Sequence, residues 1–270
     1  MAKKILTAMI FTLGLAWFTG MAHAFVIDGN LTDDWGVTPG VWSGPSGSRV
    51  NSSDWVPFAG IQGVDVVATG EDFDPINGTN AYVSPGYGGQ RFDAEAMYAA
   101  FNSTTFYYAI VTGHPLGGVT YNGTWYPGDI ALNFGSGYKY GIETVGNGIT
   151  TQGDLYSVKT WNQDPYWTPK SVTTIAAING SGAVGDGTLV YNNTYYGAGK
   201  GDHWVIEGSM PISAFGADFA WGKPFTMRWT QTCGNDVIKL NVTPTPEPAT
   251  MALFGLGLGG MAFMRRRRTA

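Results

Sequence analysis

The chain is divided into many short apolar runs by clusters of turn-forming residues, and this pattern limits the folds open to it. The runs are rich in Val, Ile, Thr, Tyr and Phe, and the segments between them are rich in Gly, Asn, Asp, Pro and Ser. The sequence has no long apolar stripe with the 3.6-residue period of a helix. Short strands joined by turns are typical of all-β proteins. The body of the chain is therefore predicted to be all-β.

Many strands with short connections favour an antiparallel β-sandwich, of the jelly-roll or immunoglobulin-like kind. Residues 102–104 and 135–137 are predicted to close hairpins, and 212–215 to form a helical turn after Pro211. Residues 42–90 are expected to form long loops over one end of the sheets, because Gly, Pro, Ser and Asp dominate them. The ten predicted strands are 96–101, 105–112, 129–134, 138–144, 155–160, 172–178, 188–191, 203–210, 225–232 and 237–242.

The first residues have the composition of an export signal. Lys3 and Lys4 form a basic start, residues 5–18 are almost wholly apolar, and small residues occupy Ala22 and Ala24. This order is typical of a secretory signal peptide. Residues 1–24 are therefore predicted to be removed, so that the mature chain begins at Phe25.

The last residues combine a short motif, an apolar run and a basic cluster. The motif is Pro246-Glu247-Pro248, and the uncharged run 249–264 follows it. As a helix this run would be about 24 Å long, which is short against a hydrocarbon core of about 30 Å. It is predicted to be a minimal membrane helix, joined to a body at 25–242 by a linker at 243–248. Residues 265–270 are expected to stay cytoplasmic, because they begin with four arginines: Arg265, Arg266, Arg267 and Arg268.

This order of motif, apolar helix and arginine cluster resembles the PEP-CTERM sorting tail of Gram-negative bacteria. The resemblance implies a membrane-embedded exosortase as partner, which recognises and removes the tail after transient anchoring in the inner membrane. It further implies release to the cell surface or the extracellular matrix. An ordinary C-terminal membrane anchor is the alternative.

Charge and cysteine content restrict the partners of the mature body. Without the two ends, nine basic and nineteen acidic residues remain, a net charge of about −10. Such a body repels nucleic acid and anionic lipid, so nucleic-acid binding is excluded, and it attracts cations such as calcium. Cys233 is the only cysteine and is predicted to be a buried thiol, with an intermolecular disulfide as the alternative.

The body resembles family 9 carbohydrate-binding modules and related DOMON-like sandwiches. The resemblance is carried by Ile27-Asp28-Gly29, by Asp33-Asp34-Trp35, by the strand pair within 93–112 and by the strand and turn at 205–216. It implies a sandwich that binds glycan. The block 225–236 also resembles the last strands of a group of PEP-CTERM proteins of unassigned function.

Two aromatic segments are candidates for a glycan site. Trp161, Tyr166 and Trp167 lie in a segment interrupted by Pro165, which is predicted to be a loop; Trp125 and Tyr126 form the second segment. Aromatic rings on loops can stack on sugars, and the Asn, Gln and Asp residues between Trp161 and Tyr166 could bind sugar hydroxyls. The alternative is that these rings cap the open ends of the sheets.

A calcium site is predicted at Asp72, Asp74 and Asn77, because Ca²⁺ takes oxygen ligands from a turning chain. Asp93 and Glu95, two residues apart on one strand, form a second candidate pair. The alternative at 72–77 is a solvated loop that uses Asp and Asn for its turns.

No constellation in the sequence favours catalysis. His114 and His203 lack the partner spacing of a zinc site or a nucleophilic triad. The leading hypothesis is a non-catalytic surface or matrix protein that binds extracellular polysaccharide, as in a biofilm. The alternatives are a glycan-active hydrolase or lyase that uses two carboxylates, and a structural matrix protein that self-associates.

Overall fold

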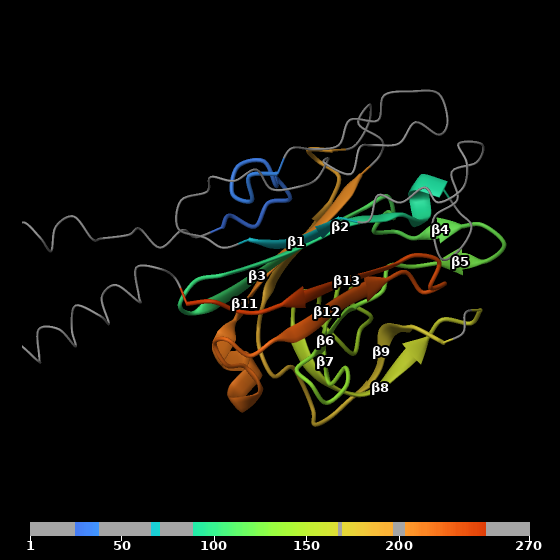
Figure 1. Cartoon of the computed structure of the whole chain (residues 1–270). Helices are drawn as coiled ribbons and strands as arrows, with labels where there is room; N and C mark the ends of the chain where they lie inside the picture. Colours follow the sequence, from blue (N-terminus) through green and yellow to red (C-terminus); the bar gives the residue numbers. More distant parts are fainter. Residues whose placement is uncertain (1–24, 38–65, 71–88, 167–168, 197–202, 247–270) are drawn as a thin grey trace, which may run out of the picture.

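The computed structural model describes residues 25–37, 66–70, 89–166, 169–196 and 203–246 (Figure 1). The predicted membrane helix 249–264 and the cleavage residues Ala22 and Ala24 lie outside the described residues, as do most of the sorting-motif residues. Those are Glu247, Pro248, Arg265, Arg266, Arg267 and Arg268. Within the described ranges, no helix is both long enough and apolar enough to cross a membrane.

The described chain is mostly β, and every pairing between its strands is antiparallel. One sheet has the order β1 (Val67–Gly70), β2 (Ala94–Phe101), β3 (Thr105–Thr112), β11 (Trp204–Pro211) and β10 (Thr188–Asn192). A second sheet has the order β13 (Val237–Val242), β12 (Phe225–Thr230), β6 (Ile130–Asn133), β7 (Tyr140–Ile142), β8 (Leu155–Gln163) and β9 (Val172–Ile178).

All ten strands predicted from the sequence are present, with boundaries shifted by a few residues at most. The helical turn predicted after Pro211 is the start of η2, a 3₁₀ segment over Ile212–Asp218. Four elements were not predicted: β1, η1 (Gly89–Phe92), β4 (Val119–Thr120) and β5 (Thr124–Trp125). All four have only two to four residues, which is too short to show a period that a sequence pattern can detect.

The buried faces of the two sheets contribute to one apolar core. Met97 and Ile110 come from the first sheet, and Leu132 and Trp229 from the second; all four are fully buried or nearly so. Figure 1 shows the two sheets running past each other with β13 next to β1 and β2. The prediction of an antiparallel β-rich body is confirmed, and its assignment to the sandwich class stays a prediction.

A second apolar cluster lies on the other face of the first sheet. Trp35 and Leu31, from the N-terminal segment, pack there against Tyr98 of β2 and Ala109 of β3. This cover explains why every residue of β2 is buried, whereas β13 alternates between buried and exposed positions. Phe25, the predicted first residue of the mature chain, belongs to this cluster and lies 4.4 Å from Trp35 between ring centroids.

Candidate functional site

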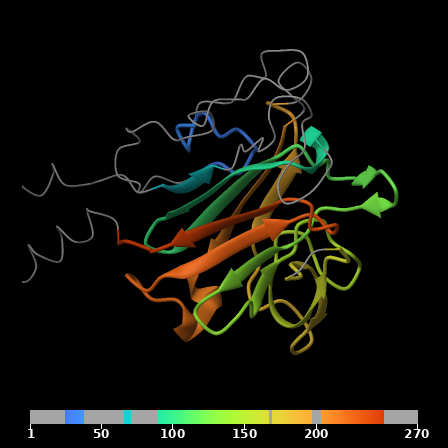
Figure 2. The same cartoon turned by 45° about the vertical axis from the view of Figure 1, so that its right-hand side comes forward.

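Trp125 ends the small hairpin β4–β5, which projects beyond the ends of both sheets (Figure 2). One side of its half-buried ring packs against Phe92, Val119 and Cys233. Its indole N–H donates to the carbonyl of Tyr121 at 2.9 Å, so the ring is fixed within the hairpin. Trp125 is therefore held rigidly at an end of the fold.

Tyr166 meets Trp125 from the β8–β9 connection, with ring centroids 5.6 Å apart in an edge-to-face arrangement. Tyr166 is 62% exposed, and Tyr126, next to Trp125, is 51% exposed. The main chain of Tyr126 is bonded twice to Thr232, through N–H to hydroxyl and through carbonyl to N–H, both at 2.9 Å. The two predicted aromatic segments thus meet at Trp125 and Tyr166. We call Trp125, Tyr126 and Tyr166 the Trp125 surface.

Asp164 holds the loop that carries Tyr166. Its fully buried carboxylate accepts the N–H of Tyr166 at 3.1 Å and the N–H of Ser171. A side chain at Gly234 would collide with it, because an added Cβ would lie 2.5 Å from Asp164 Cβ. The expectation that this carboxylate would face sugar hydroxyls is therefore wrong; it organises the loop instead. Only the Asp-Pro turn signal at Asp164 and Pro165 hinted at this role.

His114 supports the hairpin from inside the protein. Its ring is fully buried, with Nδ1 2.8 Å from the Arg91 carbonyl and Nε2 3.2 Å from the Trp125 carbonyl. Burial lowers the pKa of His114 to about 4, against the opposing effect of these two carbonyls. The ring is consequently neutral at pH 7 and donates from one nitrogen only. His114 has a structural role behind Trp125.

The predicted buried state of Cys233 is confirmed, since its side chain is 6% exposed behind Trp125. Burial raises the pKa of the Cys233 thiol to about 11. The thiolate is the reactive form of cysteine, so this thiol is inert near neutral pH.

Trp161 lies elsewhere, on the strand β8 rather than in a loop. Pro165 restricts the residue before it, Asp164, and leaves the strand intact through Gln163. The Trp161 indole donates to the Tyr138 carbonyl at 2.7 Å, and its ring lies so close to Gly141 that an added Cβ would be 2.7 Å away. Trp161 is thus packed against the sheet, and Trp167 lies outside the described residues.

Glu207 is a buried carboxylate that the sequence analysis did not identify as important. It lies on β11, and its Oε2 accepts the N–H groups of Asp28 at 3.0 Å and Gly29 at 2.7 Å. Its Oε1 accepts the indole N–H of Trp35 at 2.8 Å. Burial raises the pKa of Glu207 to about 7, although these three donors oppose the shift. Glu207 holds the N-terminal segment against the first sheet. The sequence does not reveal this role, because Glu207 and Gly29 are 178 residues apart.

Asp129 and Glu143 form a buried acidic pair at the second sheet. Asp129 accepts the N–H of Thr144 at 3.0 Å and of Ile175 at 2.7 Å, while Glu143 accepts the N–H of Gly146 at 3.0 Å. Burial, and then the neighbouring Glu143, raise the pKa of Asp129. Both side chains are at most 3% exposed, so this pair ties loops together inside the protein.

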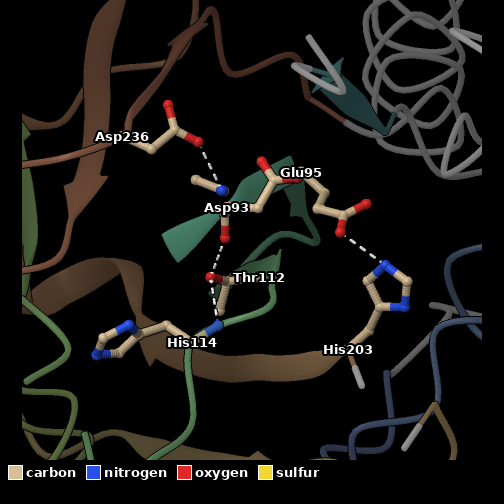
Figure 3. Close-up of polar contacts among 7 residues, drawn as sticks. Asp93, Glu95, Thr112, His114, His203 and Asp236 are labelled. Atoms are coloured by element: carbon tan, nitrogen blue, oxygen red, sulfur yellow. Dashed lines mark hydrogen bonds and ion pairs between the residues drawn. The ribbon is translucent and has the colours of Figure 1, made fainter. Parts of the chain in front are cut away.

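Asp93 and Glu95 do not share one face of a regular strand, because an irregularity between Ala94 and Ala96 interrupts β2 there. Figure 3 shows Glu95 directed at His203, with Oε1 and Nε2 2.6 Å apart. The N–H of Ala94, between the two acids, donates to Asp236 at 2.7 Å. Glu95 is therefore engaged with His203 inside the protein, which makes the pair of Asp93 and Glu95 a poor calcium site.

The predicted calcium residues Asp72, Asp74 and Asn77 lie outside the described residues. Over the described ranges, no three His, Cys, Asp or Glu side chains form a group suited to a metal ion.

Residues 244–268 match the PEP-CTERM protein-sorting motif. The match covers the motif, the apolar run and the four arginines, and it implies export through an exosortase with transient membrane anchoring by the tail. No curated protein and no solved structure matches the chain. The likeness of the body to carbohydrate-binding modules therefore stays a prediction, and the comparisons identify how the protein is sorted without identifying its ligand.

Proposed function

We propose that the body is a β-sandwich binding module for extracellular polysaccharide, delivered to the cell surface or matrix by the exosortase route. The ligand would lie on the Trp125 surface. The body would act without catalysis, and its partner would be the exopolysaccharide of the host cell.

The observation that carries this proposal is the pair of exposed tyrosines mounted on a rigid base around Trp125. Tyr126 is fixed through both main-chain bonds to Thr232, and Tyr166 through Asp164. Aromatic rings that are already ordered lose little conformational freedom when a ligand stacks on them. An exposed, rigid aromatic surface at the end of a sheet is therefore suited to a sugar chain.

The buried acids support a non-catalytic role. Glycoside hydrolysis needs two carboxyl groups on either side of the scissile bond. Asp129 and Glu143 are enclosed and engaged with main-chain N–H groups, and Glu207 is used in the same way by Asp28 and Gly29. These carboxylates serve the fold.

The proposal is tested by affinity electrophoresis of residues 25–246 through gels that contain the host's exopolysaccharide, with and without calcium. Tyr126→Ala/Tyr166→Ala is the test variant. Tyr195→Ala is the matched control, because it removes another exposed tyrosine, on the connection between β10 and β11. Retardation that is lost in the double variant and kept in the control is the expected result.

Unretarded migration of the unaltered protein in every gel would reject glycan binding. Concentration-dependent assembly in that case would favour the structural matrix protein. Retardation that persists in the double variant would reject the Trp125 surface as the site, and Trp161→Ala would then be compared.

A further inference from the structure

The chain leaves the body later than the predicted linker implies. Val242 ends β13 opposite Phe225 and is fully buried. Pro244 is also buried, and its carbonyl accepts the N–H of Gly222 at 2.8 Å. The linker predicted at 243–248 is therefore part of the fold as far as Pro244, where the match to the sorting motif begins.

This attachment leaves a very short tether between body and membrane. Only residues 245–248 separate Pro244 from Ala249, the first residue of the apolar run. Fully extended, the chain from Pro244 to Ala249 reaches about 17 Å. The headgroup layer takes up about 5–7 Å of this. While the tail is in the membrane, the Pro244 end of the body is thus held within about 10 Å of the lipid surface.

The side chains beside Pro244 suit such a surface. Trp221, next to Gly222, is 37% exposed and rests edge-on against Phe219 at 5.3 Å and Phe101 at 6.1 Å. Lys223 is exposed, and its ammonium donates to the Asp218 carbonyl at 3.3 Å. Tryptophan is favoured at the headgroup level of a bilayer, and lysine is attracted to anionic headgroups.

We propose that this end of the body, formed by Trp221, Gly222, Lys223 and Pro244, rests on the lipid surface of the membrane that holds the tail. One tryptophan and one lysine bind lipid weakly by themselves, and the net negative charge of the whole body opposes contact with anionic lipid. A tether of a few residues, however, gives an effective concentration in the millimolar range. The contact therefore forms in the anchored precursor and is lost when the tail is removed. It depends on the tail alone, so failure of glycan binding would leave it standing.

The test uses residues 25–270, which keep the tail and omit the predicted signal peptide with its Trp17. The protein is placed in vesicles of phosphatidylethanolamine and phosphatidylglycerol with acyl chains brominated near the headgroup, which quench nearby tryptophans. Trp221→Phe is compared with the unaltered chain, since Phe keeps the ring contacts with Phe101 and Phe219. A second variant carries about twenty Gly/Ser residues after Thr245. Lengthening the tether from about five to 25 residues lowers the effective concentration about tenfold.

The expected result is a quenched component that disappears in Trp221→Phe and falls severalfold in the insertion variant. Unchanged urea unfolding midpoints serve as the control for folding. Equal quenching in the unaltered chain and in Trp221→Phe would overturn the proposal. Equal quenching in the insertion variant and in the unaltered chain would overturn the role of the tether. Absence of quenching, with a crosslinker at position 221 capturing the exosortase in cells, would replace lipid by the enzyme as the occupant.

Discussion

Replacing Glu207 by Gln is expected to remove a pH dependence of folding stability that one buried carboxylate creates. The pKa of Glu207 is raised from 4.5 to about 7 in the folded protein. The folded state therefore binds a proton at a higher pH than the unfolded chain does. As pH rises from about 4.5 to about 7, the free energy of unfolding should fall by about 3 kcal/mol from this group, and the fall is complete above pH 7.

The substitution also has an effect that does not depend on pH. A Gln side chain keeps one acceptor oxygen, so its NH₂ must face either the Trp35 indole or the N–H groups of Asp28 and Gly29. A buried donor without its acceptor costs about 1–3 kcal/mol. Glu207→Gln should therefore be clearly less stable than the unaltered protein at pH 4.5. The difference should shrink or reverse by pH 8.

The assay is urea unfolding followed by tryptophan fluorescence, at constant ionic strength, at several pH values from 4.5 to 8. Other titrating groups contribute equally to both proteins, so the difference between their unfolding free energies isolates Glu207. Asp186→Asn, on an exposed loop, is the control for removing one negative charge. A difference that stays constant within about 1 kcal/mol over this range would refute the reasoning, because one pKa unit corresponds to about 1.4 kcal/mol.

Two further substitutions test the support of the Trp125 surface. His114→Gln should reduce the loss of stability on acidification. Because the pKa of His114 is lowered in the folded protein, the free energy of unfolding falls by about 3 kcal/mol as pH drops from 6.5 to 4. Equal acid sensitivity of both proteins in urea unfolding would contradict this. Gly234→Ala should cost about 2–4 kcal/mol and weaken retention on polysaccharide, because φ is +66° and the new Cβ would displace Asp164; unchanged thermal unfolding would contradict it.

The strands were predictable because their information is local. The continuous apolar run within 105–112, the alternation within 237–242 and the turn residues between runs indicate strands without knowledge of their partners. The cover on the first sheet was not predictable in this way. It depends on a contact between Trp35 and Glu207, which are 172 residues apart, and no local sequence pattern around either residue indicates the other as its partner.

In the candidate site, too, local features were predictable from the sequence and long-range contacts were not. Aromatic residues near turns were sufficient to single out Trp125 and Tyr166, but their contact joins segments 41 positions apart. The sequence predicts Trp161 in the same loop as Tyr166, because Pro165 is expected to interrupt the whole segment. The structure shows that the interruption acts only locally, so β8 continues through Trp161 to Gln163 and the loop begins after it.

The Trp125 surface and the proposed lipid-contacting end at Trp221 together define an orientation of the body relative to the membrane. Trp221 contacts Phe101 at the start of the β2–β3 turn, whereas His114, just beyond the other end of β3, touches the Trp125 carbonyl. The eight residues of β3 span about 24 Å. Figure 1 shows η2 and the hairpin β4–β5 at these opposite ends. In the proposed orientation, a body tethered at Pro244 presents the Trp125 surface away from the lipid, so the proposed polysaccharide ligand would have access to it before the exosortase removes the tail.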